Sequence, residues 1–303
     1  MAAAHPADAA TGACGYQPRA LRQPTPEEVI ITGVALMSWA LAIVAIVRGN
    51  GRFVDHHALI GHRTLPWALA LLSFLLAWQV MIAAMMLPTS LPMIRLFARA
   101  SGGQARAGLA RGVFVAAYLV VWAGFAVLAF VGDAALHALL DHAGWLGDHP
   151  AVITGSVLLL AGCFQFSTLK ERCLEQCRHP ASFLLRWYRR GLGPAWNLGV
   201  RHGLFCLGCC WTLMLLMFAV GVGSVVWMAL LTGVMLIEKT ARWGKRLVPW
   251  VGLLLLLWGN LVLFQPHWLP PALRGDGSAH AHVYVHSSLS GASPGAGVRP
   301  SRG

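Results

Sequence analysis

Seven hydrophobic stretches separated by polar loops constrain the fold of this chain more than any other feature of its sequence. A helix needs about 20 mostly apolar residues to cross the hydrocarbon core of a membrane. The stretches that approach this length are residues 29–47, 67–87, 112–131, 151–169, 199–220, 222–237 and 247–264. We therefore predict an all-α membrane protein, a polytopic bundle of about seven transmembrane helices.

The composition argues against the alternative of two soluble domains. Apolar residues make up 57% of the chain and charged residues 11%, whereas soluble domains contain about 45–50% and 25%. So few charged side chains do not cover the surface of a soluble protein of 303 residues. The polar, proline-containing segment before the first stretch does not resemble a secretory signal, so we expect the first stretch to be a retained anchor.

The positive charges predict how the chain is oriented in the membrane. Lys and Arg concentrate in the cytoplasmic loops of membrane proteins. With seven spans, 17 of the 23 Lys and Arg residues fall on the side of the N-terminal tail. We therefore expect a cytoplasmic N-terminus and a periplasmic C-terminus. Because this distribution explains most of the net charge of +12, the expected partner is the lipid bilayer and no nucleic acid is expected.

The fifth stretch carries a concentration of potential metal ligands. His202, Cys206, Cys209, Cys210 and Met214 recur at spacings of three and four residues, which places them on one stripe of a helix, near the middle of the membrane. Imidazole, thiol and thioether are the ligands that soft and borderline metal ions prefer. Cysteine is also a common small buried residue, so packing alone is the alternative. Three glycines allow a neighbouring helix to approach closely: they are Gly199, Gly203 and Gly208.

Two further cysteines precede this stretch in a predicted cytoplasmic loop. Cys173 and Cys177 are four residues apart, so one helical face would carry both thiols. We expect the fourth stretch to continue as one helix through them, with Cys163 and Lys170 near the same face, and to end before Pro180. The reducing cytoplasm favours metal or redox chemistry over structural disulfides.

Methionines on the second stretch extend this set of soft ligands. Met81 and Met85 share one helical face, and Pro88 and Pro92 are expected to bend or end the helix and to free backbone carbonyls. Such a methionine stripe also occurs in ordinary packing. In combination with the thiols, it favours Cu(I), with Zn(II) or an iron–sulfur cluster as the next candidates.

Buried thiolates require compensating positive charge. The candidate cations are Lys170, Arg201 and Lys239. Glu238 and Lys239 end the sixth hydrophobic stretch, where desolvated charges are costly. We therefore expect a local ion pair or a role in the site for this dipeptide.

The last part of the chain contains a second type of ligand. Ten of the thirteen His residues lie on the predicted outer side. His280, His282 and His286 are close together among Gly, Ser and Pro residues. Such tracts bind divalent metal ions weakly, so we interpret these three imidazoles as ligands that capture metal.

Several of these blocks together resemble the bacterial predicted metal-binding integral membrane proteins, the family of domain of unknown function 2182. The resemblance covers about residues 70–265, and its motifs lie in residues 81–88, 165–180, 199–214 and 238–239. It implies a multi-pass protein of the bacterial inner membrane that resembles a copper chaperone. Cys163 departs from the family pattern, which has an aromatic residue at that position, so we treat it as accessory.

We therefore expect a membrane protein that binds Cu(I) for delivery or relay, to a copper-dependent enzyme or another copper chaperone, or across the membrane. The alternative is a transmembrane thiol–disulfide redox relay that uses the Cys206/Cys209 and Cys173/Cys177 pairs. The sequence has no phosphate-binding Gly-Lys-Ser/Thr loop, so a transfer protein is favoured over an enzyme or pump. The expected parts are a polar cytoplasmic tail (1–28), a seven-helix metal-binding membrane domain (29–265) and a His-containing flexible periplasmic tail (266–303).

Overall fold

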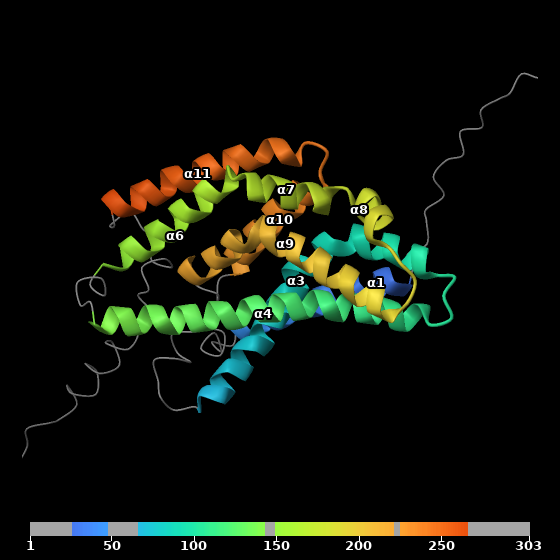
Figure 1. Ribbon diagram of the computed structural model, residues 1–303. Helices are drawn as coiled ribbons and strands as arrows, with labels where there is room; N and C mark the ends of the chain where they lie inside the picture. The colour runs from blue at the N-terminus through green and yellow to red at the C-terminus, as the bar shows by residue number, and fades with distance from the viewer. Residues whose placement is uncertain (1–25, 48–65, 143–148, 221–224, 266–303) are drawn as a thin grey trace, which may run out of the picture.

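The computed structural model describes residues 26–47, 66–142, 149–220 and 225–265, and the elements in these ranges are all α-helices. The helices are α1 (Pro26–Val47), α3 (Trp67–Ser101), α4 (Ala107–His142), α6 (Pro150–Gln165), α7 (Thr168–Arg178), α8 (Pro180–Trp187), α9 (Leu192–Val220), α10 (Val225–Thr240) and α11 (Gly244–Phe264) (Figure 1). The predicted all-α class is confirmed for this part of the chain.

Five of the helices, α1, α3, α4, α9 and α11, are long and apolar enough to cross a membrane. α6 and α7 pass the same test only as a pair bent by 64°, which raises the number of candidate spans to six in the described residues. α10 corresponds to the sixth predicted stretch and has 16 residues, fewer than the about 20 of a straight crossing. The finding is therefore five or six candidate spans.

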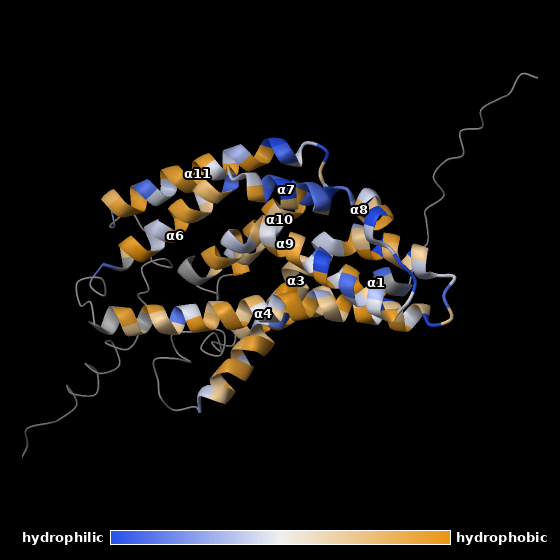
Figure 2. Ribbon diagram, viewed as in Figure 1, coloured by the Kyte–Doolittle hydropathy of each residue, from blue (hydrophilic) through white to orange (hydrophobic). Residues whose placement is uncertain are grey.

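The surface of the molecule fits a lipid environment. Large apolar side chains point outward, among them Leu128 at 72% exposed and Phe264 at 81% exposed. Figure 2 shows mainly hydrophobic helices, with hydrophilic residues concentrated on α7 and around the connections from α3 to α4 and from α10 to α11. An apolar outer surface of this kind is costly in water and favourable in lipid.

α9 lies at the centre of the helix packing. It runs along α4 on one side and contacts α7 and α6 on the other, while α6 pairs with α11 and α1 pairs with α3 (Figure 1). The predicted close approach at the glycines is confirmed. A Cβ atom at Gly199 would collide with the Phe114 carbonyl oxygen of α4, and one at Gly208 would lie 2.6 Å from Cys173 Sγ of α7. Small residues thus bring α4 and α7 close to the cysteines of α9.

The helix predicted to continue from the fourth stretch through the loop cysteines is interrupted, so that expectation is wrong. Ser167 begins α7 as its N-cap residue, and its Oγ accepts a hydrogen bond from the Lys170 backbone N–H over 3.1 Å. Such a cap satisfies an amide that the first helical turn leaves free. Cys163 and Lys170 therefore lie on different helices, the former exposed and the latter buried. α7 does end before Pro180, as predicted.

α3 continues through Pro88 and Pro92, so the prolines do not end the helix. Proline has no N–H to donate to the carbonyl four residues earlier. For Pro88 that carbonyl belongs to Ala84, and its oxygen accepts a hydrogen bond from Trp39 Nε1 of α1 over 3.1 Å. The predicted free carbonyl thus attaches α1 to α3.

Candidate metal centre

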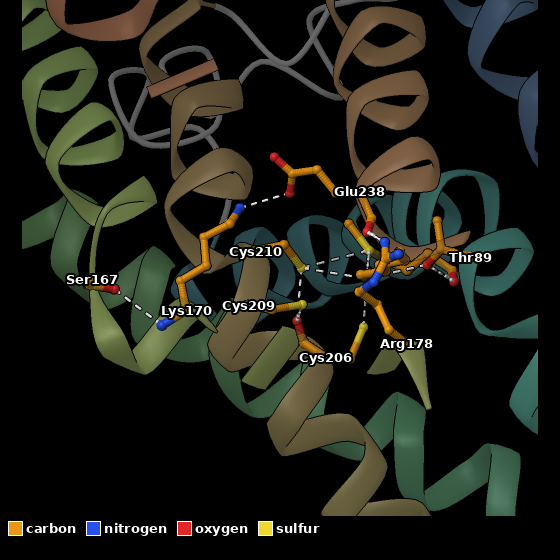
Figure 3. A network of polar contacts seen from close by, with 10 residues as sticks. Thr89, Ser167, Lys170, Arg178, Cys206, Cys209, Cys210 and Glu238 are labelled. Carbon is orange, nitrogen blue, oxygen red and sulfur yellow. Dashed lines mark hydrogen bonds and ion pairs between the residues drawn. The ribbon is translucent and has the colours of Figure 1, made fainter. Parts of the chain in front are cut away.

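The three cysteines of α9 lie in the interior of the molecule. Cys206, Cys209 and Cys210 are each 1% exposed. Cys206 Sγ lies 3.2 Å from the Tyr118 hydroxyl of α4. The thiols of Cys209 and Cys210 donate hydrogen bonds to the Cys206 carbonyl oxygen over 3.1 Å and 2.8 Å. Figure 3 shows the three residues side by side on the helix.

The ammonium group of Lys239, near the end of α10, reaches into this cluster. Its Nζ lies 3.1 Å from Cys206 Sγ and 3.9 Å from Cys210 Sγ. On the side of α3, Nζ lies 3.8 Å from Met86 Sδ and 3.3 Å from Thr89 Oγ1. Three sulfur atoms and one hydroxyl from two helices therefore surround one buried positive charge. Figure 3 labels Thr89, Cys206 and Cys210, three of the residues around this charge.

The separation of the sulfur atoms suits a soft metal ion with three ligands. Cys210 Sγ and Met86 Sδ are 4.0 Å apart. With metal–sulfur bonds of about 2.3 Å, as in zinc thiolate sites, this separation corresponds to a sulfur–metal–sulfur angle of about 120°. That is the angle of a trigonal site. Cys206 Sγ and Cys210 Sγ both lie within 4 Å of Lys239 Nζ, so the Cys206 thiol is the candidate for the third ligand.

Cys173 and Cys177 of α7 lie against α9 beside the buried cysteines. The side chains of Cys177 and Cys209 are close enough to interact. Cys173 Sγ packs on Gly208, where the lack of a side chain makes room for the sulfur atom. The structure thus brings together two cysteine groups that the sequence places in different segments. Cys177, Cys209, Cys210 and Met86 form a line of neighbouring sulfur-containing side chains.

Buried ionic contacts hold α7 against the end of α10. Lys170 Nζ and Glu238 Oε2 form an ion pair of 2.8 Å, and both side chains are 2% exposed. The ion pair expected for Glu238 is therefore confirmed, and Figure 3 shows it beside the cysteines. The Arg178 guanidinium donates to the backbone carbonyls of Glu238, Ala241 and Arg242. These contacts fix the end of α10, where Lys239 lies.

A family model matches residues 75–262, which include the cysteine cluster, α7 and the end of α10. The model is that of the PpoB2 family, described as a copper chaperone, and the match covers more than half of the chain. The chain belongs to the PpoB2 copper chaperone family. This finding confirms the copper-chaperone-like family that the motifs indicate. No curated protein and no solved structure matches the chain.

The three candidate cations have different positions in this member of the family. Lys239 contacts the thiols directly. Lys170 is paired with Glu238. Arg201 lies over the Trp187 ring, with Cζ 3.9 Å from its centroid. Lys239 is therefore the cation best placed to balance the charge of the thiolates.

Met86 is a candidate ligand that sequence reasoning missed. In the residues that the structure describes, no three side chains of His, Cys, Asp or Glu are grouped so as to hold one ion. A set of three around Cys206 and Cys210 thus needs the Met86 thioether. The spacing argument favoured Met81 and Met85, which are buried and stay predicted ligands. Thr89, a polar residue one turn after Met86, was the sequence signal that could have identified this face of α3. Its hydroxyl lies beside Lys239, so this face is turned toward the cysteines.

His202 and Met214 flank the cysteines on α9, and both are buried. The His202 ring stacks with those of Phe114 and Tyr118, at centroid distances of 5.9 Å and 5.6 Å. Its Nε2 atom is buried and, among the described residues, has no hydrogen-bond partner. The predicted ligands His280, His282 and His286 lie outside the described residues.

Proposed function

We propose that this chain binds Cu(I) inside the bundle of helices and relays it to a copper-dependent enzyme or another copper chaperone. The observation that carries the proposal is the sulfur set of Cys206, Cys210 and Met86, with 4.0 Å between the last two sulfur atoms. Thiolate and thioether ligands together favour Cu(I) over Zn(II). Membership of a copper chaperone family supports the choice of metal.

The line of sulfurs supports relay rather than storage alone. Cys177 and Cys209 form a thiol pair at the contact of α7 with α9. Cys210 follows Cys209 in the chain and contacts Met86. Cu(I) can move along such a line by ligand exchange, in which each new metal–sulfur bond forms as an earlier one breaks. Cys173 and Cys177 are then the site at which copper reaches or leaves the buried set.

The proposed setting is the bacterial inner membrane, with about seven spans, a cytoplasmic N-terminus and a periplasmic C-terminus. In this arrangement α6 and α7 form one broken span and α10 a short one. The cations of α7 and of the connections from α3 to α4 and from α10 to α11 then face the cytoplasm, and Figure 2 shows hydrophilic residues in these segments. The thiols of α7 receive or release copper on the cytoplasmic side, and the C-terminal imidazoles capture metal ions on the periplasmic side.

Copper titration of the purified full-length protein under reducing conditions tests the proposal. The Cys210→Ser variant is expected to lose Cu(I) affinity by at least about tenfold against a competing chelator. Cys163→Ser is the matched control, because Cys163 is an exposed cysteine of α6. Its affinity should equal that of the wild type. A Cys206/Cys209/Cys210→Ser variant that retains wild-type copper would refute the proposal.

A thiol–disulfide relay is the second candidate, and the contact between the Cys177 and Cys209 thiols favours it. In the described residues all six cysteines are free thiols. Alkylation of thiols in living cells separates the two functions. A disulfide that forms and is reduced reversibly supports the redox relay, whereas persistently reduced thiols with bound metal support copper transfer.

A further inference from the structure

Three charged side chains are buried in the part of the chain that the structure describes, namely Lys170, Glu238 and Lys239. Lys170 and Glu238 neutralise each other over 2.8 Å. Lys239 is 6% exposed, and its ammonium donates to Cys206 Sγ over 3.1 Å. A buried charge is stable only beside an opposite charge. The positive charge of Lys239 therefore belongs to the electrostatic balance of the sulfur set.

The hydrogen bonds indicate which of these side chains are charged before metal binds. Cys206 Sγ faces both Lys239 Nζ and the Tyr118 hydroxyl, which are contacts suited to a thiolate. Cys209 and Cys210 donate their thiol hydrogens to the Cys206 carbonyl oxygen over 3.1 Å and 2.8 Å, as protonated thiols do. One thiolate and one ammonium then give a buried cluster with no net charge.

A monovalent metal ion preserves this neutrality and a divalent ion does not. When Cu(I) binds, it replaces the thiol proton of Cys210, and this proton leaves to solvent. Two thiolates, one ammonium and one Cu(I) again sum to zero. Zn(II) in the same place leaves one uncompensated positive charge in surroundings that solvate it poorly.

We propose that Lys239 is a specificity-determining residue, which makes the sulfur set selective for monovalent Cu(I) over divalent ions such as Zn(II). The inference rests on the proposed function, because it takes Cys206 and Cys210 as the thiolate ligands. Thr89 Oγ1, 3.3 Å from Lys239 Nζ, can hold the ammonium beside the set once the metal takes the sulfurs.

A third thiolate on the same ion would restore neutrality for Zn(II). The described residues contain no group of three His, Cys, Asp or Glu side chains arranged around one ion. The Cys209 thiol donates to the Cys206 carbonyl oxygen over 3.1 Å. The ligand set thus contains two thiolates and one thioether. The charge of Lys239 then determines that a monovalent ion, and not a divalent one, leaves this set neutral.

Two competition titrations of the full-length protein in detergent test the role of Lys239. One uses a chromogenic Cu(I) chelator and the other a Zn(II)-responsive dye, and the result is the ratio of the Zn(II) Kd to the Cu(I) Kd. In Lys239→Leu this ratio should fall by at least about tenfold, because one unit charge next to the metal is removed. Lys239→Arg keeps the charge and should keep the ratio within about threefold.

Matched variants separate this effect from damage to the fold. Lys245→Leu removes a lysine of α11 whose side chain is 47% exposed, and it should leave the ratio unchanged. Lys239→Gln should lower the ratio as leucine does, and it replaces the leucine variant where circular dichroism shows that leucine prevents folding. An unchanged or higher ratio in the neutral variants overturns the inference. A wild-type protein that binds no Cu(I) overturns the proposed function instead.

Discussion

The assignment of Met86 as a copper ligand gives the sharpest prediction, since it comes from the structure alone. The change is Met86→Leu, which removes the thioether and nearly preserves the side-chain volume. Met86 is fully buried on α3, at 0% exposure. Exchanges between methionine and leucine in a core cost less than about 1.5 kcal/mol, so the fold should survive.

The expected loss of copper affinity follows from the geometry. The Cys210 and Met86 sulfurs, 4.0 Å apart, span the trigonal angle, so leucine leaves two ligands where there were three. We expect Cu(I) affinity to fall by about 10–100-fold, which corresponds to about 1.4–2.8 kcal/mol. The assay is competition with a chromogenic Cu(I) chelator, with thermal unfolding of the copper-free protein measured in parallel.

Two methionines of the same helix serve as comparisons. Met93 is also buried on α3, two turns beyond Met86, and Met93→Leu should bind copper as the wild type does. Met85 is the neighbour that the sequence pattern favoured as a ligand. Wild-type affinity in Met86→Leu together with a loss in Met85→Leu would refute the structural assignment and support the sequence-based one.

Two further predictions concern the packing of α7. Lys170→Met leaves Glu238 buried without its partner at 2.8 Å. It should lower the free energy of unfolding, measured in denaturant titrations, by about 3–5 kcal/mol. The double variant with Glu238→Leu should recover much of that stability, and no recovery would contradict the ion-pair explanation. Gly208→Ala places a Cβ atom 2.6 Å from Cys173 Sγ, so it should separate α7 from α9 and slow the transfer of copper to a chelator. Gly233→Ala is the control, because a Cβ atom there has no atom within 4 Å. The Gly233→Ala protein should transfer copper at the wild-type rate.

The long apolar helices were predictable because hydrophobic length alone specifies them. The fifth stretch gave α9, and its spacing placed Cys206, Cys209 and Cys210 on one buried stripe, as the structure has them. The break between α6 and α7 was missed, because Phe164 and Phe166 continue the hydrophobic stretch up to Ser167. The capping hydroxyl at that position was the local signal for the break.

The partners within the site could not be predicted from spacing. Lys239 and Met86 are 153 residues apart in the chain, and Lys170 and Glu238 are 68 apart. Periodicity defines the face of one helix but not the neighbour toward which that face turns. Sequence reasoning therefore identified Lys239 as one of several candidate cations, and only the packing of α10 beside α3 and α9 shows which one meets the sulfurs.

The way in which Arg178 holds the end of α10 also determines which substitutions the chain can tolerate. The guanidinium binds carbonyl oxygens, which every amino acid has, so side chains at Ala241 and Arg242 can change without loss of these hydrogen bonds. Arg178 itself has no such freedom, because lysine cannot span several carbonyls with one planar group. A library of random substitutions should thus accept many residues at positions 241 and 242 and almost none at 178.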